Sequence, residues 1–261
     1  MKNYKYILFF NQIGIDSIGK VGGKNASLGE MYNQLNPMGI SIPNGFALTA
    51  KGYRLFRKAN NLEKPLKDLL SSLDTKQYSN LSFIGEKARN LILSATIPEE
   101  IRFEIHFAYQ SLRKQCGVDT LDVAVRSSAT AEDLPTASFA GQMQSFLNIS
   151  GESQLLDAIH RCFISLYTDR AIKYRHDMGF AKLGIAISVG IQQMVRSDKA
   201  SSGVAFTIDP DSGFENTIII NGCWGLGENI VQGTVTPDEW MVFKPILGNP
   251  DFNPILKKHC G

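Results

Sequence analysis

The chain has 261 residues, of which 43% are hydrophobic and 20% are charged, and this composition is typical of a globular protein. The net charge is only +2, with basic and acidic residues interspersed, which argues against a nucleic acid or a membrane surface as the partner. The four cysteines lie far apart, and no segment approaches the roughly 20 apolar residues of a membrane span, so we expect a soluble protein of the reducing cytoplasm.

The first two predicted elements are a short strand and a helix that begins with glycine. Residues 6–10 (YILFF) are too few for the core of a signal peptide and indicate a buried strand. A glycine pair at 22–23 then opens a helix in which apolar residues recur at helical spacing as far as Leu35. Free N–H groups at a helix start favour an anion, and Lys24 stands in that first turn. An ordinary helix start has the same composition, and the spacing of a Walker A loop is absent.

Helices are predicted from about 49 to 117 and again from 151 to 179, because apolar residues recur there every three or four positions. Pro98, followed by two glutamates, marks one of the helix starts. We expect the aromatic residues of these helices to be core contacts. The predicted apolar stripes are Tyr53, Phe56 and Ala59; Phe83, Lys87 (its stem only), Leu91 and Ala95; Ile101, Ile105, Ala108 and Leu112; and Leu155, Ile159, Phe163 and Leu166.

The segment 125–142 combines the end of a predicted strand with one arginine, several hydroxyl side chains and a glycine. Alternating apolar residues lead up to Arg126, so its guanidinium is expected on a rigid strand beside a loop of small residues. Such an arrangement is suited to holding phosphate oxygens. The alternative is a simple turn in which Arg126 pairs with Glu132 or Asp133, and the spacing does not separate the two interpretations.

The last part of the chain is rich in predicted strands, at 185–195, 203–208 and 217–221. Helices therefore come first and a mixed or antiparallel sheet follows, which indicates an α+β or mixed α/β fold. Three glycines within 222–228 imply unusual backbone angles or a close approach of the backbone to another group. A tight connection between strands would have the same composition.

Several of these stretches together carry a family resemblance. They stand in one order, cover nearly the whole chain, and are 21–31, 43–49, 125–142, 165–171, 203–213 and 224–243. In them the chain resembles the nucleotide-binding region of the phosphoenolpyruvate synthase (pyruvate, water dikinase) family. The resemblance implies an ATP-grasp-like fold, in which two α/β lobes enclose ATP and Mg²⁺. Residues 1–195 would form the first lobe, with the helical region at about 49–117 followed by a strand-rich phosphate-binding region, and 196–261 would begin an incomplete second lobe.

The resemblance also implies a set of site residues. Lys24 and Arg126 would be phosphate-binding cations, and Gln192 would occupy a hinge strand beside the adenine. Gly141, Ser145 and Phe146 would form the loop and strand over the nucleotide. The residue types agree with this chemistry, because phosphoryl transfer is catalysed mainly by positioning and by stabilisation of charge.

The family reaction would convert ATP, pyruvate and water into AMP, phosphoenolpyruvate and phosphate through a phosphohistidine. Family members are much longer, and none of the four histidines here stands in a motif like their phosphohistidine loop. We therefore expect a shortened piece of such an enzyme, which binds ATP but does not turn over alone. Its Mg²⁺ ligands would lie beyond residue 261, and pyruvate would bind only to domains that are absent. An oligomeric full-length protein is compatible with the sequence.

Two rival functions belong to other classes. The first is the nucleotide domain of a rifampicin-type antibiotic phosphotransferase, which shares this region but uses another acceptor. The stretches at 203–213 and 224–243 favour the synthase over it. The second is a folded fragment without nucleotide binding, since binding loops often stay mobile when their other half is missing.

Overall fold

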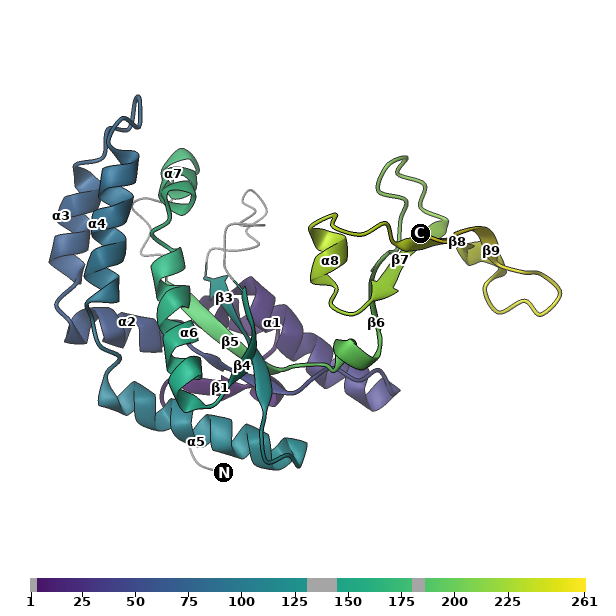
Figure 1. Ribbon diagram of the computed structural model, residues 1–261, viewed down its shortest axis with the longest axis horizontal. Helices are drawn as coiled ribbons and strands as arrows, with labels where there is room; N and C mark the ends of the chain where they lie inside the picture. Colours follow the sequence, from purple (N-terminus) through teal and green to yellow (C-terminus); the bar gives the residue numbers. More distant parts are fainter. Residues whose placement is uncertain (1–3, 131–144, 180–185) are drawn as a thin grey trace. The chain divides into compact units, whose positions relative to one another are not determined.

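The computed structural model describes residues 4–130, 145–179 and 186–261 of the chain. These residues divide into two compact units, Met1–Met194 and Val195–Gly261, and each unit has a sheet of its own (Figure 1). The predicted mixed α/β fold is confirmed, and both sheets are antiparallel. In the described part of the chain, no helix combines the length and the apolarity needed to cross a membrane.

The first unit is built on a five-stranded sheet with the order β1-β2-β5-β3-β4. Two of its strands come from the start of the chain and three from the middle, so the sheet brings distant segments together. The strands are β1 (Ile7–Phe9), β2 (Gly45–Leu48), β3 (Asp122–Ala129), β4 (Ser145–Ser150) and β5 (Ile187–Gln193). Because β5 lies between β2 and β3, both of its edges are hydrogen-bonded.

Seven α-helices surround this sheet among the described residues. They are α1 (Ile18–Leu35), α2 (Ala50–Ala59), α3 (Glu63–Ser71), α4 (Leu81–Leu93), α5 (Glu99–Cys116), α6 (Glu152–Ser165) and α7 (Asp169–Asp177). The single helix predicted over 151–179 is therefore two helices. Thr168 separates them, because its side chain accepts a hydrogen bond from the backbone N–H of Ala171 and so caps α7.

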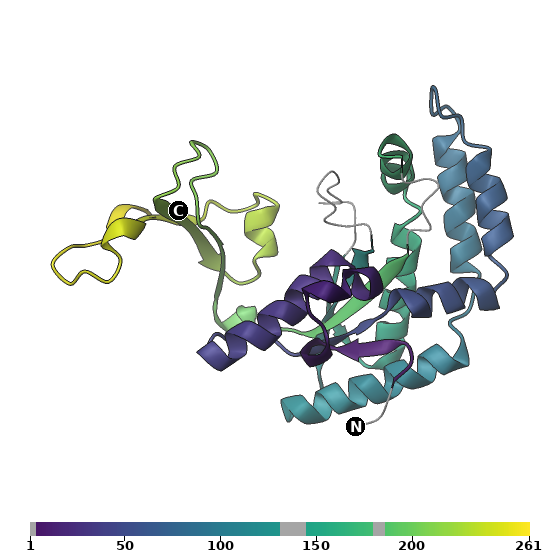
Figure 2. The ribbon, with the colours of Figure 1, turned by 180° about the vertical axis from the view of Figure 1, so that it is seen from behind.

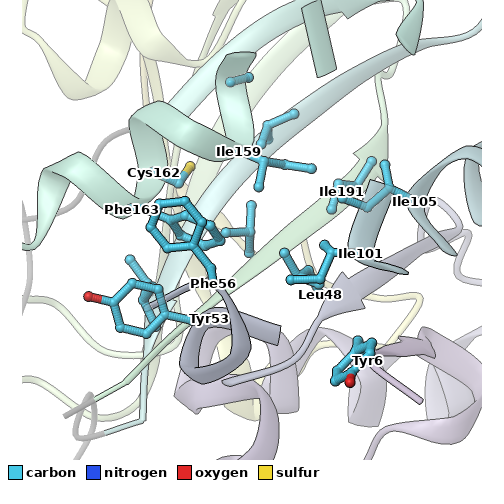
Figure 3. Close-up of a cluster of buried hydrophobic side chains, with 14 of the residues drawn as sticks. Tyr6, Leu48, Tyr53, Phe56, Ile101, Ile105, Ile159, Cys162, Phe163 and Ile191 are labelled. Atoms are coloured by element: carbon cyan, nitrogen blue, oxygen red, sulfur yellow. The ribbon is translucent and has the colours of Figure 1, made fainter. Parts of the chain in front are cut away.

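The main hydrophobic core lies between one face of the sheet and helices α2, α5 and α6. Figure 3 shows its aromatic centre, formed by Tyr53, Phe56 and Phe163. The ring centroid of Phe163 lies 5.1 Å from that of Tyr53 and 4.9 Å from that of Phe56. The predicted stripes of α5 and α6 are confirmed as buried. Of the stripe predicted over 83–95, Ala95 is buried and Leu91 packs against the core, whereas Phe83 is 58% exposed and its neighbour Ile84 is buried instead.

Helix α1 covers the opposite face of the sheet. Ala47 belongs to a small cluster under α1, whereas its neighbours Phe46 and Leu48 belong to the main core. Since successive strand residues point to opposite faces, α1 and the main core lie on different sides of the sheet. The two views agree, with α6 in front of the sheet in Figure 1 and α1 in front in Figure 2. The first unit thus has three layers.

The second unit is a four-stranded sheet with the order β6-β7-β8-β9. Its elements are β6 (Ser201–Phe206), β7 (Thr217–Trp224), the short helix α8 (Glu228–Val231), β8 (Asp238–Phe243) and β9 (Ile255–His259). Among residues 195–261, Ile219 is the only buried hydrophobic residue, and Trp224 is 83% exposed. The unusual backbone angles predicted for the glycine-rich stretch are confirmed at Gly225, whose φ is +82°.

Candidate functional site

Arg126 lies in the middle of β3 and is exposed. Its cross-strand neighbours are Ser145 at the start of β4 and Gly190 on β5. Gly190 in turn pairs with Ala47, which lies under α1. Because cross-strand neighbours project from the same face, Arg126 and Ser145 stand together on the α1 side of the sheet. The structure thus brings two of the predicted site residues into direct juxtaposition.

Helix α1 is kinked where it approaches β3. The predicted glycine-opened helix start is confirmed, because the non-helical Gly22 interrupts Ile18–Leu35 and a helical segment starts anew after the glycine pair. Gly22 has a φ of +75°, a backbone conformation that is not helical and that favours glycine. A Cβ atom at Gly22 would lie 2.3 Å from Oγ of Ser128 and 2.7 Å from the carbonyl oxygen of Ala129. Only glycine allows this close packing of α1 against the end of β3.

Asn25 fixes α1 above the centre of the sheet. Its buried side chain donates hydrogen bonds to the carbonyl oxygen of Val21 and to Oγ of Ser188, each at 3.1 Å. A Cβ atom at Gly190 would lie 2.2 Å from Oδ1 of Asn25, so α1 rests directly on the residue beside Arg126. Lys24 immediately precedes Asn25 and is exposed. Its backbone is therefore held close to the row that contains Arg126.

Gln192 lies two residues beyond Gly190 on β5, and its side chain is buried. Nε2 of Gln192 donates a hydrogen bond of 3.1 Å to the carbonyl oxygen of Pro43, the residue two positions before β2. One end of the amide thus holds the chain that enters β2. The predicted place of Gln192 beside an adenine stays a prediction.

Phe146 stands on the other face of β4. It pairs with Val125 across β3 and packs against the main core, with the guanidinium of Arg161 6.0 Å from its ring centroid. Ser145 and Phe146 are neighbours in the chain but project from opposite faces of the sheet. The role predicted for Phe146 over a nucleotide stays a prediction, and Gly141 lies outside the described residues.

Histidines and acidic residues do not form a metal centre in the described residues. No group of three or more His, Cys, Asp and Glu side chains there is arranged to hold a metal ion. His106 contacts a single carboxylate, with 2.6 Å between its Nδ1 and Oε2 of Glu152.

Sequence reasoning missed Asn25 and Gly190 as parts of this site. Gly190 stands inside an apolar strand sequence, and a glycine in such a place often marks the close approach of another group. The close approach of another group to Gly190 could therefore have been predicted from the sequence. For Asn25 the sequence holds no equivalent signal, because its partner Ser188 is 163 residues away.

Residues 18–261 match the family described as pyruvate phosphate dikinase, AMP/ATP-binding domain. The chain belongs to this family. A phosphoenolpyruvate synthase of Synechocystis sp. is 50% identical over 264 residues, which cover 100% of this chain and 32% of that protein. Proteins of the same name from Helicobacter pylori and Escherichia coli are each 46% identical, over 98% and 92% of this chain and 32% and 30% of their own lengths.

Two conclusions about this member of the pyruvate phosphate dikinase AMP/ATP-binding family follow. The resemblance that the collinear motifs indicate is confirmed, and it covers nearly the whole chain. The chain spans about a third of the length of the curated relatives that it matches.

Proposed function

We propose that this chain is the ATP-binding part of a phosphoenolpyruvate synthase, with the triphosphate on the α1 side of the first sheet. One observation carries the proposal. The exposed Arg126 is the cross-strand neighbour of both Ser145 and Gly190, and α1 packs directly on Gly190. The family match supports ATP as the ligand. The names of the relatives support a phosphoenolpyruvate synthase as the parent enzyme.

Each predicted residue has a role in this arrangement. Arg126 binds two phosphate oxygens at once through its planar guanidinium, and Lys24 supplies a second, mobile positive charge. Ser145 offers a hydroxyl donor to the phosphates, and Phe146 anchors that strand from the core side. Gly141 lies outside the described residues and keeps the role over the nucleotide that the resemblance implies. Gln192 presents its amide toward the adenine edge. It lies two residues from Gly190, about 7 Å along β5 from the row of Arg126.

The fold is an ATP-grasp-like arrangement in this proposal. Residues 1–195 make the first lobe, and 196–261 begin the second. Two features support this division. The chain forms two compact units with separate sheets, and the strand that carries Gln192 is the last of the first unit.

The parent enzyme would convert ATP, pyruvate and water into AMP, phosphoenolpyruvate and phosphate in the cytoplasm. In that reaction this part would bind ATP and present its β-phosphoryl group to a histidine elsewhere in the enzyme. Pyruvate would bind outside these residues, and so would the Mg²⁺ that accompanies ATP. A coupled assay on the chain alone should therefore detect no phosphoenolpyruvate.

Two alternatives are less well supported. A rifampicin-type antibiotic phosphotransferase would share the nucleotide domain, but the relatives of 46–50% identity described above are named phosphoenolpyruvate synthase. A folded chain without nucleotide binding is the other alternative, and a binding measurement separates it from the proposal.

The test is calorimetric titration of ATP into the purified chain and two single variants. Arg126→Ala should weaken binding about 10- to 150-fold, which corresponds to about 1.5–3 kcal/mol for a hydrogen bond to a charged group. Arg102→Ala removes an exposed arginine of α5 and should leave the affinity unchanged. Equal affinity of Arg126→Ala and the unmodified chain would refute the site. Absence of binding in a folded chain would favour the fragment without nucleotide function.

A further inference from the structure

A cavity opens at the β1 edge of the first sheet, where the starts of α1 and α2 approach the strand. Its volume is about 360 Å³, which is within the usual range for small-molecule sites. The walls come from β1, from the first turn of α1 and from the beginning of α2. None of the proposed nucleotide-binding residues lines it.

The rim of this cavity is strongly basic. Lys5, Lys20, Lys51 and Arg54 line it, and no acidic side chain of the described residues does. All four are exposed. Lys5 and Lys51 both stand over the ring of Tyr6, with their Nζ atoms 5.1 and 5.8 Å from its centroid. Like charges gathered in a concave surface raise the local concentration of anions.

Of the four rim cations, Lys5 lies close enough to Glu100 and Glu104 to interact with them electrostatically. The carboxylate of Glu104 accepts hydrogen bonds from the backbone N–H groups of Lys5 and Tyr6, and Glu100 accepts one from the Tyr6 hydroxyl. Both glutamates are on α5 and outside the cavity lining. No described ion pair involves the Lys20, Lys51 or Arg54 side chain.

The floor of the cavity is apolar. Tyr4 and Leu8 contribute partly exposed apolar surface to it, and Ile7 also lines it although its side chain is almost completely buried. An inorganic anion would contact only the charged rim. A ligand that combines negative charge with an apolar body would fill both parts, since burial of apolar surface adds to the attraction of the charges.

We propose that this basic cavity binds a small organic anion with an apolar body, such as a phosphate monoester, independently of the nucleotide site. The sheet register separates the two sites. Leu8 pairs with Ala47, Ala47 with Gly190, and Gly190 with Arg126, so three strand spacings lie between the cavity and the arginine. At roughly 4.8 Å per spacing, this amounts to about 14 Å.

The first test is calorimetric titration of phenyl phosphate into the chain, with inorganic phosphate for comparison. Phenyl phosphate should bind more tightly than inorganic phosphate. The double variant Lys51→Ala/Arg54→Ala should weaken its binding at least about tenfold, as expected for the loss of charged hydrogen bonds. The control Lys58→Ala/Lys64→Ala removes the same charge from exposed positions of α2 and α3 and should leave binding unchanged.

A second measurement locates the bound probe. Phenyl phosphate should slow the reductive methylation of Lys51 but not that of Lys58, as read by mass spectrometry. Arg126→Ala should leave the phenyl phosphate affinity unchanged, which separates this site from the proposed nucleotide site. The proposal is overturned by the absence of saturable binding, by equal weakening in the control variant, or by loss of binding in Arg126→Ala.

Discussion

Ser128 and Ser188 are cross-strand neighbours on the α1 face of the sheet, yet their hydroxyl groups differ in hydrogen bonding. Oγ of Ser188 donates to the carbonyl oxygen of Leu48 at 2.7 Å and accepts from Asn25. Oγ of Ser128 is buried and has no hydrogen-bond partner in the described structure. A buried hydroxyl without a partner keeps its desolvation penalty, so removing it can be neutral or stabilising.

The same substitution at these two positions should therefore have different effects. We expect Ser188→Ala to lower the free energy of unfolding by about 1–3 kcal/mol, because it leaves Asn25 and Leu48 without their partner. Ser128→Ala should leave the stability unchanged or raise it. Urea unfolding of both variants measures the difference, with Ser128→Ala as the matched control. Equal destabilisation by the two substitutions would contradict this account.

At the scale of single residues, the sequence predicted Arg126 at the end of a strand, and the structure places it within β3 with an exposed side chain. The alternation of apolar residues before it was sufficient, because one face of β3 had to be buried. The contacts that fix α1 beside it were not predictable. They depend on the missing side chain of Gly190 and on hydrogen bonds between residues far apart in the chain.

At the scale of elements, the turn between α3 and α4 is organised around one carboxylate. Asp74 accepts hydrogen bonds from the Ser79 hydroxyl at 2.6 Å and from the backbone N–H groups of Lys76 and Gln77 at 3.1 and 3.2 Å. These bonds, led by that of Ser79, lower the pKa of Asp74 from 3.8 to about 2. The ionised form is therefore favoured by folding.

This shift predicts a pH-dependent contribution to stability. A depressed carboxyl pKa stabilises the fold above pH 3.8, and the contribution is lost as the pH falls through about 2. Asp74→Asn should therefore be less stable than the unmodified chain at neutral pH, and the difference should shrink between about pH 4 and pH 2.

The measurement is chemical unfolding of both proteins across this pH range. Asp68→Asn, at an exposed position of α3, is the control and should show no such convergence. A difference between Asp74→Asn and the unmodified chain that does not change with pH would show that the carboxylate charge is not responsible.

Helices were more predictable from the sequence than strands. The periodicity of α5 and α6 identified their buried faces, because each helix packs one continuous stripe on the core. The periodicity was wrong for Phe83 in α4, which is large but exposed, and right for Leu91 and Ala95, which contact the core. The strand β9 was missed because its five residues are all exposed, so no apolar alternation marks it.

At the scale of the whole molecule, the two units differ in the extent of their cores. Among its described residues the first unit encloses two clusters of buried hydrophobic side chains, whereas Ile219 is the only buried hydrophobic residue of 195–261. Backbone hydrogen bonds alone contribute little net stability, so a sheet without a core opens readily.

Hydrogen exchange should reveal this difference. We expect the backbone amides of β7 and β8 to exchange at least about tenfold faster than those of β3 and β5, after correction for intrinsic rates. All four strands are hydrogen-bonded on both edges, so the comparison isolates the effect of the core. Peptide-level mass spectrometry makes the measurement. Equal protection of the two sheets would show that the second unit is stabilised by something other than its own buried residues.

The register of the first sheet also determines which changes of chain length the protein tolerates. Leu8, Ala47, Gly190, Arg126 and Ser145 form one continuous row across all five strands. Inserting one residue within β3 ahead of Arg126 would turn its guanidinium from the α1 face into the hydrophobic core. An insertion after Met194, where the first unit ends, would leave this row intact. Natural length variation in such domains should therefore accumulate at the boundary between the units and avoid the strands.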